Sequence, residues 1–158
     1  MITGVRAILF CDEVRADEDG VSLIGAYGVP LMAESRPGFM TVTLFAHLDV
    51  DITATQGAIR IEAGTFDEAF RFNVTTDRQL TAMVLPIMLP VLKDGLVRVT
   101  IADDAHRKKT WVYRWPATFT PDAQVIGEEA GVDILASARE AAKTVRNGLV
   151  GPGAVRIN

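Results

Sequence analysis

Residues 39–51 read Phe-Met-Thr-Val-Thr-Leu-Phe-Ala-His-Leu-Asp-Val-Asp, and this stretch decides the fold class. Apolar side chains occupy every second position from Met40 to Val50, and most of the positions between them carry threonine, histidine or aspartate. Successive side chains of a β-strand point to opposite faces of the sheet. The alternation therefore predicts a strand that buries one face in a core.

Shorter stretches of the same pattern surround this strand, and short polar turns separate most of them. The alternation predicts further strands at residues 5–15, 21–29, 58–63, 69–75, 80–85, 96–102 and 110–120. The polar residues 17–20 predict a hairpin between the first two of these. Residues 30–38 contain two prolines and are expected to be a linker. Residues 86–90 are expected to be a loop or a sheet edge, because Pro86 and Pro90 lack an amide donor.

About eight short strands, each with one apolar face to bury, indicate a mainly β protein. We expect residues 1–120 to form a two-sheet antiparallel β-sandwich of the immunoglobulin-like or C2-like kind. A small closed barrel is the alternative architecture.

Residues 121–158 differ from the strands and are expected to form a C-terminal extension with a helix at residues 133–147. Asp133 is suited to cap its start, and Asn147-Gly148 is a typical stop. The apolar face is rich in alanine, so we expect it to pack closely on its own sandwich, on a second copy or on a partner. The candidate partner contacts on this face are Ile134, Leu135, Ala138, Ala142 and Val145.

The bulk composition narrows the possible functions. The 158 residues carry a net charge of −4, which disfavours attraction to nucleic acid. The longest apolar run, residues 83–92, is far shorter than a membrane-spanning helix requires. The single cysteine and the lack of a signal-peptide pattern at the N-terminus favour a soluble, cytoplasmic protein. No sequence motif points to a cofactor.

Acidic residues near strand ends are the candidates for a metal site. Asp49, Asp51, Asp103 and Asp104 are the possible ligands, because carboxylates from two strand ends can converge on Ca²⁺ in a β-sandwich. His47 lies on the same predicted face as Asp49. The other interpretation, which we favour, is an acidic outer face that contacts only water.

Two further groups have both a structural and a functional interpretation. Cys11 is followed by Asp12 and Glu13, which raise a thiol pKa, so we expect a buried structural cysteine rather than a nucleophile. Trp111, Tyr113 and Trp115 share one strand face. We expect this row in the core, with a protein-contact surface or a stacking platform for sugars or bases as alternatives.

One pair of segments resembles a known family. Residues 7–15 read Ala-Ile-Leu-Phe-Cys-Asp-Glu-Val-Arg, and residues 21–28 read Val-Ser-Leu-Ile-Gly-Ala-Tyr-Gly. This is similar to the opening of a family of small bacterial proteins of uncharacterised function, which continue into a proline-containing linker and a β-rich, sandwich-like body. The resemblance implies the fold and no activity.

The sequence thus favours a non-enzymatic module that binds another protein or assembles with copies of itself. The alternative is a domain that binds a small ligand or a metal ion through its acidic strand-end loops. An enzyme of unrecognised type is a third hypothesis, since no reactive constellation stands out among the residues.

Overall fold

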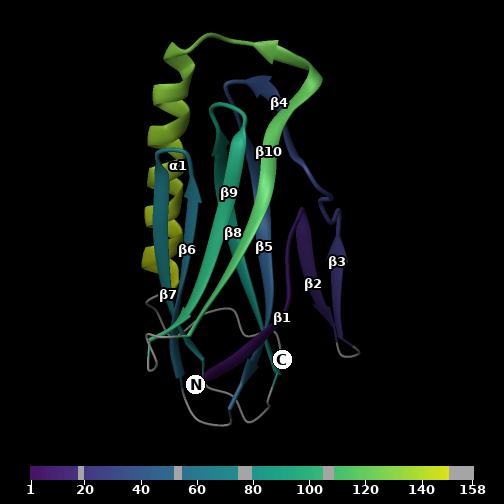
Figure 1. Cartoon of the computed structure of the whole chain (residues 1–158), viewed down its shortest axis with the longest axis vertical. Helices are drawn as coiled ribbons and strands as arrows, with labels where there is room; N and C mark the ends of the chain where they lie inside the picture. Colours follow the sequence, from purple (N-terminus) through teal and green to yellow (C-terminus); the bar gives the residue numbers. More distant parts are fainter. Residues whose placement is uncertain (18–19, 52–54, 75–79, 105–108, 150–158) are drawn as a thin grey trace.

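The computed structural model describes residues 1–17, 20–51, 55–74, 80–104 and 109–149, in which ten β-strands precede one helix (Figure 1). The first five strands are β1 (Ile2–Cys11), β2 (Glu13–Asp17), β3 (Gly20–Ile24), β4 (Leu31–Arg36) and β5 (Gly38–Val50). The next five are β6 (Thr55–Ala63), β7 (Phe66–Val74), β8 (Leu80–Val91), β9 (Gly95–Asp103) and β10 (Thr110–Val125). The helix α1 spans Glu129–Leu149. The expectation of a mainly β protein with one C-terminal helix is confirmed.

The strands form three sheets. One has the order β1-β5-β8, a second has the order β4-β10-β9-β6-β7, and β2 pairs with β3 alone. All pairs are antiparallel except β4 with β10, which run parallel, so the expectation of purely antiparallel sheets is wrong at this pair. The five-stranded sheet curls like half of a barrel instead of lying flat against the other sheet.

The core lies between the three-stranded and five-stranded sheets. Strand β5 confirms the alternation seen in the sequence, because all six apolar residues on its inner face are buried, from Met40 to Val50. Ile59, Ile61 and Val99 of the five-stranded sheet belong to the same apolar cluster. Registered pairing of β5 with both neighbours holds its apolar face toward the core along the whole strand.

Helix α1 packs against β8 and β7, which are edge strands of the three-stranded and five-stranded sheets (Figure 1). Ala138 has 0% and Ala142 has 2% of its surface exposed, and these small side chains let the helix approach the sheets closely. Arg146 fixes the C-terminal half by pairing with Glu68 and donating to the carbonyl of Ala69. No helix in the described part of the chain combines the length and the apolar character that crossing a membrane requires.

Both proline-containing segments, residues 30–38 and 86–90, contribute to β-strands in the structure. Residues 30–38 were expected to be a linker, but Leu31–Arg36 forms β4 because the parallel pairing with β10 satisfies its backbone. Strand β8 runs through both Pro86 and Pro90, which pair with Thr43 and Phe39 of β5. It lies at the edge of its sheet, where a missing amide donor is tolerated, so the sheet-edge alternative is the correct one.

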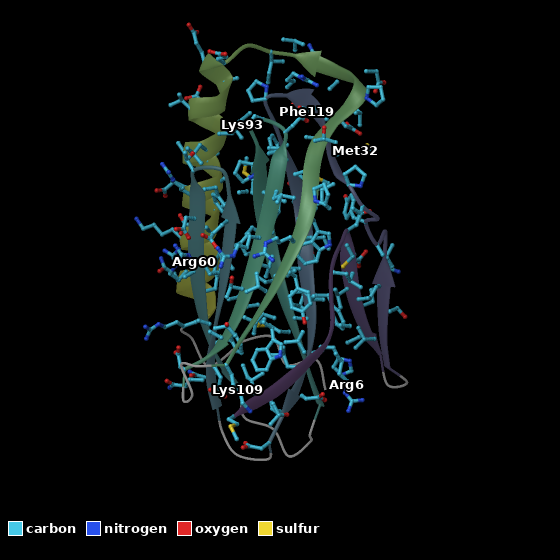
Figure 2. The ribbon with its side chains drawn as sticks, viewed as in Figure 1. Arg6, Met32, Arg60, Lys93, Lys109 and Phe119 are labelled. Carbon is cyan, nitrogen blue, oxygen red and sulfur yellow. The ribbon has the colours of Figure 1, made fainter. Side chains whose placement is uncertain are left out.

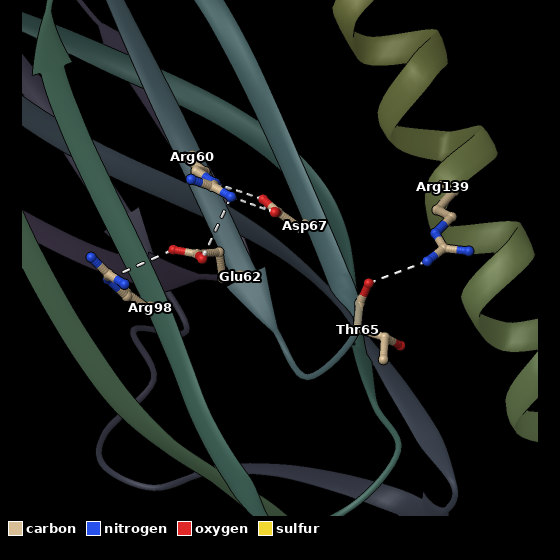
Figure 3. A network of polar contacts seen from close by, with 6 residues as sticks. All are labelled: Arg60, Glu62, Thr65, Asp67, Arg98 and Arg139. Carbon is tan, nitrogen blue, oxygen red and sulfur yellow. Dashed lines mark hydrogen bonds and ion pairs between the residues drawn. The ribbon is translucent and has the colours of Figure 1, made fainter.

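The outer face of the five-stranded sheet carries a network of charged side chains (Figures 2 and 3). Arg60 of β6 contacts Asp67 of β7 at 2.5 Å, and Glu62 lies between Arg60 and Arg98 at 3.8 and 3.6 Å. Arg139 of α1 donates to the carbonyl of Thr65 at 3.2 Å and ties the helix to the β6–β7 turn. Most of these side chains are exposed, so the network contributes little to stability.

Candidate functional site

An apolar pocket of about 640 Å³ opens at the end of the molecule where β10 leads into α1. The ends of β4, β8 and β10 converge here with the first turns of the helix, and Lys93 and Phe119 mark the place in Figure 2. Its apolar lining comprises Pro37, Leu92, Phe119, Val125, Val132 and Leu135. The volume falls within the range of pockets that bind small molecules.

Gly131 leaves the space that the pocket occupies beside the helix. A Cβ atom added to Gly131 would lie 3.6 Å from Pro37 Cγ and 3.7 Å from Leu92 Cδ2, which are ordinary contact distances. The backbone of Gly131 is helical and its amide donates to the carbonyl of Glu128 at 3.0 Å. A larger side chain at this position would therefore project into the pocket without breaking the helix.

Two valines leave the rim of the pocket apolar and open to solvent. Val125 is 75% exposed and Val132 is 71% exposed, and the neighbouring Ile126 is also exposed. Val125 ends β10, whereas Val132 lies in the first turn of α1, so the rim is shared by two elements. Contiguous exposed apolar groups around a hollow are typical of binding surfaces.

Charged groups surround the apolar lining. The Arg36 guanidinium lies 4.5 Å from the centroid of the Phe119 ring, in cation–π contact. Lys93 stands on the other wall, and within the described residues neither cation has a carboxylate partner. Asp94 accepts a hydrogen bond from the hydroxyl of Thr118, and Glu128 lies at the start of the helix. The pocket thus offers an apolar interior whose charged lining consists of two cations and two carboxylates.

The helix face expected to contact a partner packs on the protein's own core. Ile134, Ala138 and Ala142 are buried, and Leu135 and Val145 are partly buried against the same cluster. This face is covered by β7 and β8, so it is not open to a partner while the helix is docked. Only Leu135 also lines the pocket. Asp133, expected to cap the helix, lies inside it, because the helix begins at Glu129.

Three of the four acidic metal candidates bind groups of the chain itself through their carboxylates. Asp49 accepts from Arg6 Nε at 2.7 Å, and Asp51 pairs with the N-terminal amine at 2.5 Å. Asp103 is fully buried and accepts from the Ile2 amide at 2.7 Å, whereas the Asp104 amide donates to Gln56. Within the described residues, no three histidine, cysteine, aspartate or glutamate side chains lie together as a metal site requires.

The expected burial of Cys11 is confirmed. The side chain is buried, its thiol contacts the carbonyl of Thr43 at 3.6 Å, and burial together with Asp12 raises the thiol pKa. In the aromatic row, Trp115 is buried and packs edge-on against Phe10, with ring centroids 4.9 Å apart. Trp111 and Tyr113 are partly buried against the same core, so the core interpretation of the row holds.

The residues that resemble the bacterial family form a clasp at the base of the β2–β3 hairpin. The Tyr27 hydroxyl donates to the Asp12 carboxylate, and the Tyr27 amide donates to the carbonyl of Phe10 at 2.9 Å. The Asp12 amide lies 3.0 Å from the Ile24 carbonyl and 3.2 Å from that of Gly25. Gly25 has a φ of +63°, and a Cβ there would overlap the Asp12 carboxylate. The motif is thus explained by local structure.

Sequence reasoning missed the pocket, because its lining residues come from five separate segments and share no motif. The only signals available were the glycines of residues 127–131, just before the expected helix, and the apolar residues beyond the expected end of the last strand. Comparison with models of protein families finds no match, and comparison with curated proteins also finds none.

Proposed function

We propose that this protein is a non-enzymatic binding module that holds an apolar side chain of a protein partner in the end pocket. The observation that carries the proposal is the pairing of a 640 Å³ apolar pocket with an exposed rim at Val125 and Val132. Leaving two valines in water is unfavourable unless a partner covers them, and burying an aliphatic side chain contributes about 1.5–3 kcal/mol. The helix and sheets that surround the pocket supply a rigid frame, which we propose is sandwich-like.

The polar groups at the pocket suit recognition rather than a reaction. Among the described residues that line it there is no cysteine, histidine or serine, whereas two cations and two carboxylates are present. Arg36 and Lys93 favour a partner segment in which a carboxylate follows the apolar side chain. The net charge of −4 supports a protein rather than a nucleic-acid partner, and the single cysteine supports a cytoplasmic location.

A second candidate is a small amphipathic carboxylate or sulfonate in the same pocket. The volume favours it, because pockets of roughly 300–1,000 Å³ commonly hold small molecules. The apolar part would fill the space beside Gly131, and its anionic group would meet Arg36 or Lys93. This second candidate site is not the one expected from the sequence at the acidic strand ends. There, Asp49, Asp51 and Asp103 already bind groups of the chain.

The test is a peptide selection on the full chain, with a variant that fills the pocket. Random peptides are selected on the wild type and counter-selected on Gly131→Leu, and affinities are then measured by fluorescence anisotropy. Ala136→Leu, on an exposed helix position, is the matched control. Selected peptides should share an apolar and an acidic residue, bind the control like wild type, and lose about tenfold or more in affinity for Gly131→Leu.

Two results would overturn the proposal. Peptides that bind Gly131→Leu as tightly as wild type would place their site elsewhere. If no peptide binds, but dodecanoate or anilinonaphthalene sulfonate saturates the wild type and not Gly131→Leu, the pocket belongs to a small ligand instead. Urea unfolding of each variant establishes that the fold is intact before binding is compared.

A further inference from the structure

The β2–β3 hairpin stands apart from the body of the protein and forms a sheet of only two strands (Figure 1). Four of the five residues of β3 are exposed, including the large apolar residues Val21 at 39% and Ile24 at 38%. A two-stranded hairpin is marginally stable in water, and three or more strands with an apolar face are needed for independent stability. The hairpin is therefore a sheet that lacks further strands.

The outer edge of β3 carries none of the devices that normally protect an edge strand. Strand β2 covers one edge of β3, and no described strand pairs with the other. In antiparallel pairing, every second residue turns its N–H and C=O away from the neighbouring strand. Edge strands are usually protected by charges, prolines or bulges. Residues Gly20-Val21-Ser22-Leu23-Ile24 contain no charge or proline, and their pairing with β2 is regular.

We propose that β3 pairs antiparallel with β3 of a second copy, about a two-fold axis that passes through Ser22. In this register Val21 lies opposite the partner's Leu23, and Gly20 lies opposite the partner's Ile24. Every cross-strand pair then joins uncharged residues, and Ser22 faces the partner's Ser22. A two-fold interface must be self-complementary. Strand β3 meets this requirement, because in this register it places no charged residue opposite another.

The chemistry of the strand favours a second copy over the alternative edge. Strand β2 carries Glu13 and Arg15, and a two-fold pairing centred on Arg15 would set two guanidinium groups against each other. Pairing through β3 instead gives a continuous ribbon of four strands, two from each copy. The apolar side chains of Val21 and Leu23 would lie beside those of the partner on one face of the ribbon.

The clasp at the base of the hairpin gives such a dimer a defined shape. Asp12 and Tyr27 link the start of β2 and the end of β3 to β1, through the backbone bonds to Ile24 and Phe10. A hairpin fixed at its base loses little further freedom when it pairs, which lowers the entropic cost of association. The end pocket is not part of this surface, so self-association and partner binding are independent.

The test is a charge exchange at Ser22, which is exposed and so tolerates substitution in the folded chain. Full-length wild type should show a concentration-dependent monomer–dimer equilibrium in sedimentation velocity and light scattering. Ser22→Lys and Ser22→Glu should each weaken the dimer by about fivefold or more, because like charges then face each other at the axis. An equimolar mixture of the two variants should form a heterodimer at least as readily as wild type.

Two controls separate this surface from the others. Ala16→Lys places a charge on β2, opposite Val21 and one strand away from the proposed edge, and should weaken the dimer much less than Ser22→Lys does. Gly131→Leu fills the end pocket and should also dimerise like wild type. This control separates a failure of the dimer proposal from a failure of the proposed partner binding in the pocket. In the wild type, hydrogen exchange at β3 amides should slow as protein concentration rises.

Three outcomes would overturn the proposal. The wild type remains monomeric at the highest concentration that stays soluble, or both single variants dimerise as tightly as wild type. The third is that the mixture fails to restore a dimer that each variant has lost, which excludes a two-fold axis at Ser22.

Discussion

The hydrogen bond from the Tyr27 hydroxyl to the Asp12 carboxylate makes a testable contribution to stability. Substituting Tyr27→Phe removes the donor and leaves the ring in place. A hydrogen bond to a charged group contributes about 1.5–3 kcal/mol when buried, and solvent screening lowers this at a half-exposed site. We expect Tyr27→Phe to lower the free energy of unfolding by about 1 kcal/mol at pH 7.

The same bond makes stability depend on alkaline pH. It raises the pKa of Tyr27 to about 12, with burial and the charge of Asp12 adding to the effect, whereas an unfolded tyrosine ionises near pH 10. The folded chain holds this proton more tightly than the unfolded chain. The stabilisation is therefore complete below pH 10 and is lost as pH rises from about 10 to 12. The difference between wild type and Tyr27→Phe should vanish over that window.

Urea unfolding followed by the fluorescence of Trp111 and Trp115 measures these differences. A double-mutant cycle with Asp12→Ala isolates the pair, and we expect a coupling energy of about 1 kcal/mol at pH 7. Tyr113→Phe is the control, because burial alone raises the pKa of Tyr113, and at pH 7 it should change stability by less than about 0.5 kcal/mol. Strict additivity of Asp12→Ala and Tyr27→Phe would refute the assignment of the bond.

Three further substitutions test the packing, each by urea unfolding. Gly57→Ala should destabilise the fold by about 1–3 kcal/mol, because the added Cβ would lie 2.5 Å from Phe72 Cζ and force the core apart. Ala138→Leu should lower the free energy of unfolding by a similar amount, because it overpacks the buried contact between the helix and the sheets. Ala136→Leu, on an exposed position, should leave stability nearly unchanged. Arg60→Ala should lower the free energy of unfolding by less than about 1 kcal/mol, because its ion pair with Asp67 is exposed. Added salt should make this difference smaller still, since it screens the pair.

Elements with a clear period were predicted well. Strand β5 was expected at residues 39–51 and spans Gly38–Val50, because burial of one face reinforces the alternation at every second residue. The helix was expected at residues 133–147 and spans Glu129–Leu149. Its first turn was missed because it contains Gly131, and glycine is a weak helix former.

Elements fixed by distant contacts were predicted poorly. Residues 5–15 were expected to be one strand, yet the structure divides them at Asp12, where β1 turns from its pairing with β5 into the hairpin. The parallel pairing of β4 with β10 joins segments about 85 residues apart, and no local pattern marks it. The pocket depends on this same pairing, because Arg36 and Phe119 meet only after β4 has docked on β10.

The most distinctive motif of the sequence therefore relates to the geometry of the chain rather than to a reaction. The base of the hairpin is held by the hydrogen bond from Tyr27 to Asp12 and by the close approach of Gly25 to the Asp12 carboxylate. None of these residues lines the end pocket. A substitution that releases the clasp would free the hairpin while leaving the two main sheets paired. If β3 joins two copies, Tyr27→Phe should weaken the dimer as well as the fold, because a looser hairpin loses more freedom on pairing. If Tyr27→Phe lowers stability but leaves the dissociation constant of the dimer unchanged, the clasp stabilises the monomer and does not contribute to dimerisation.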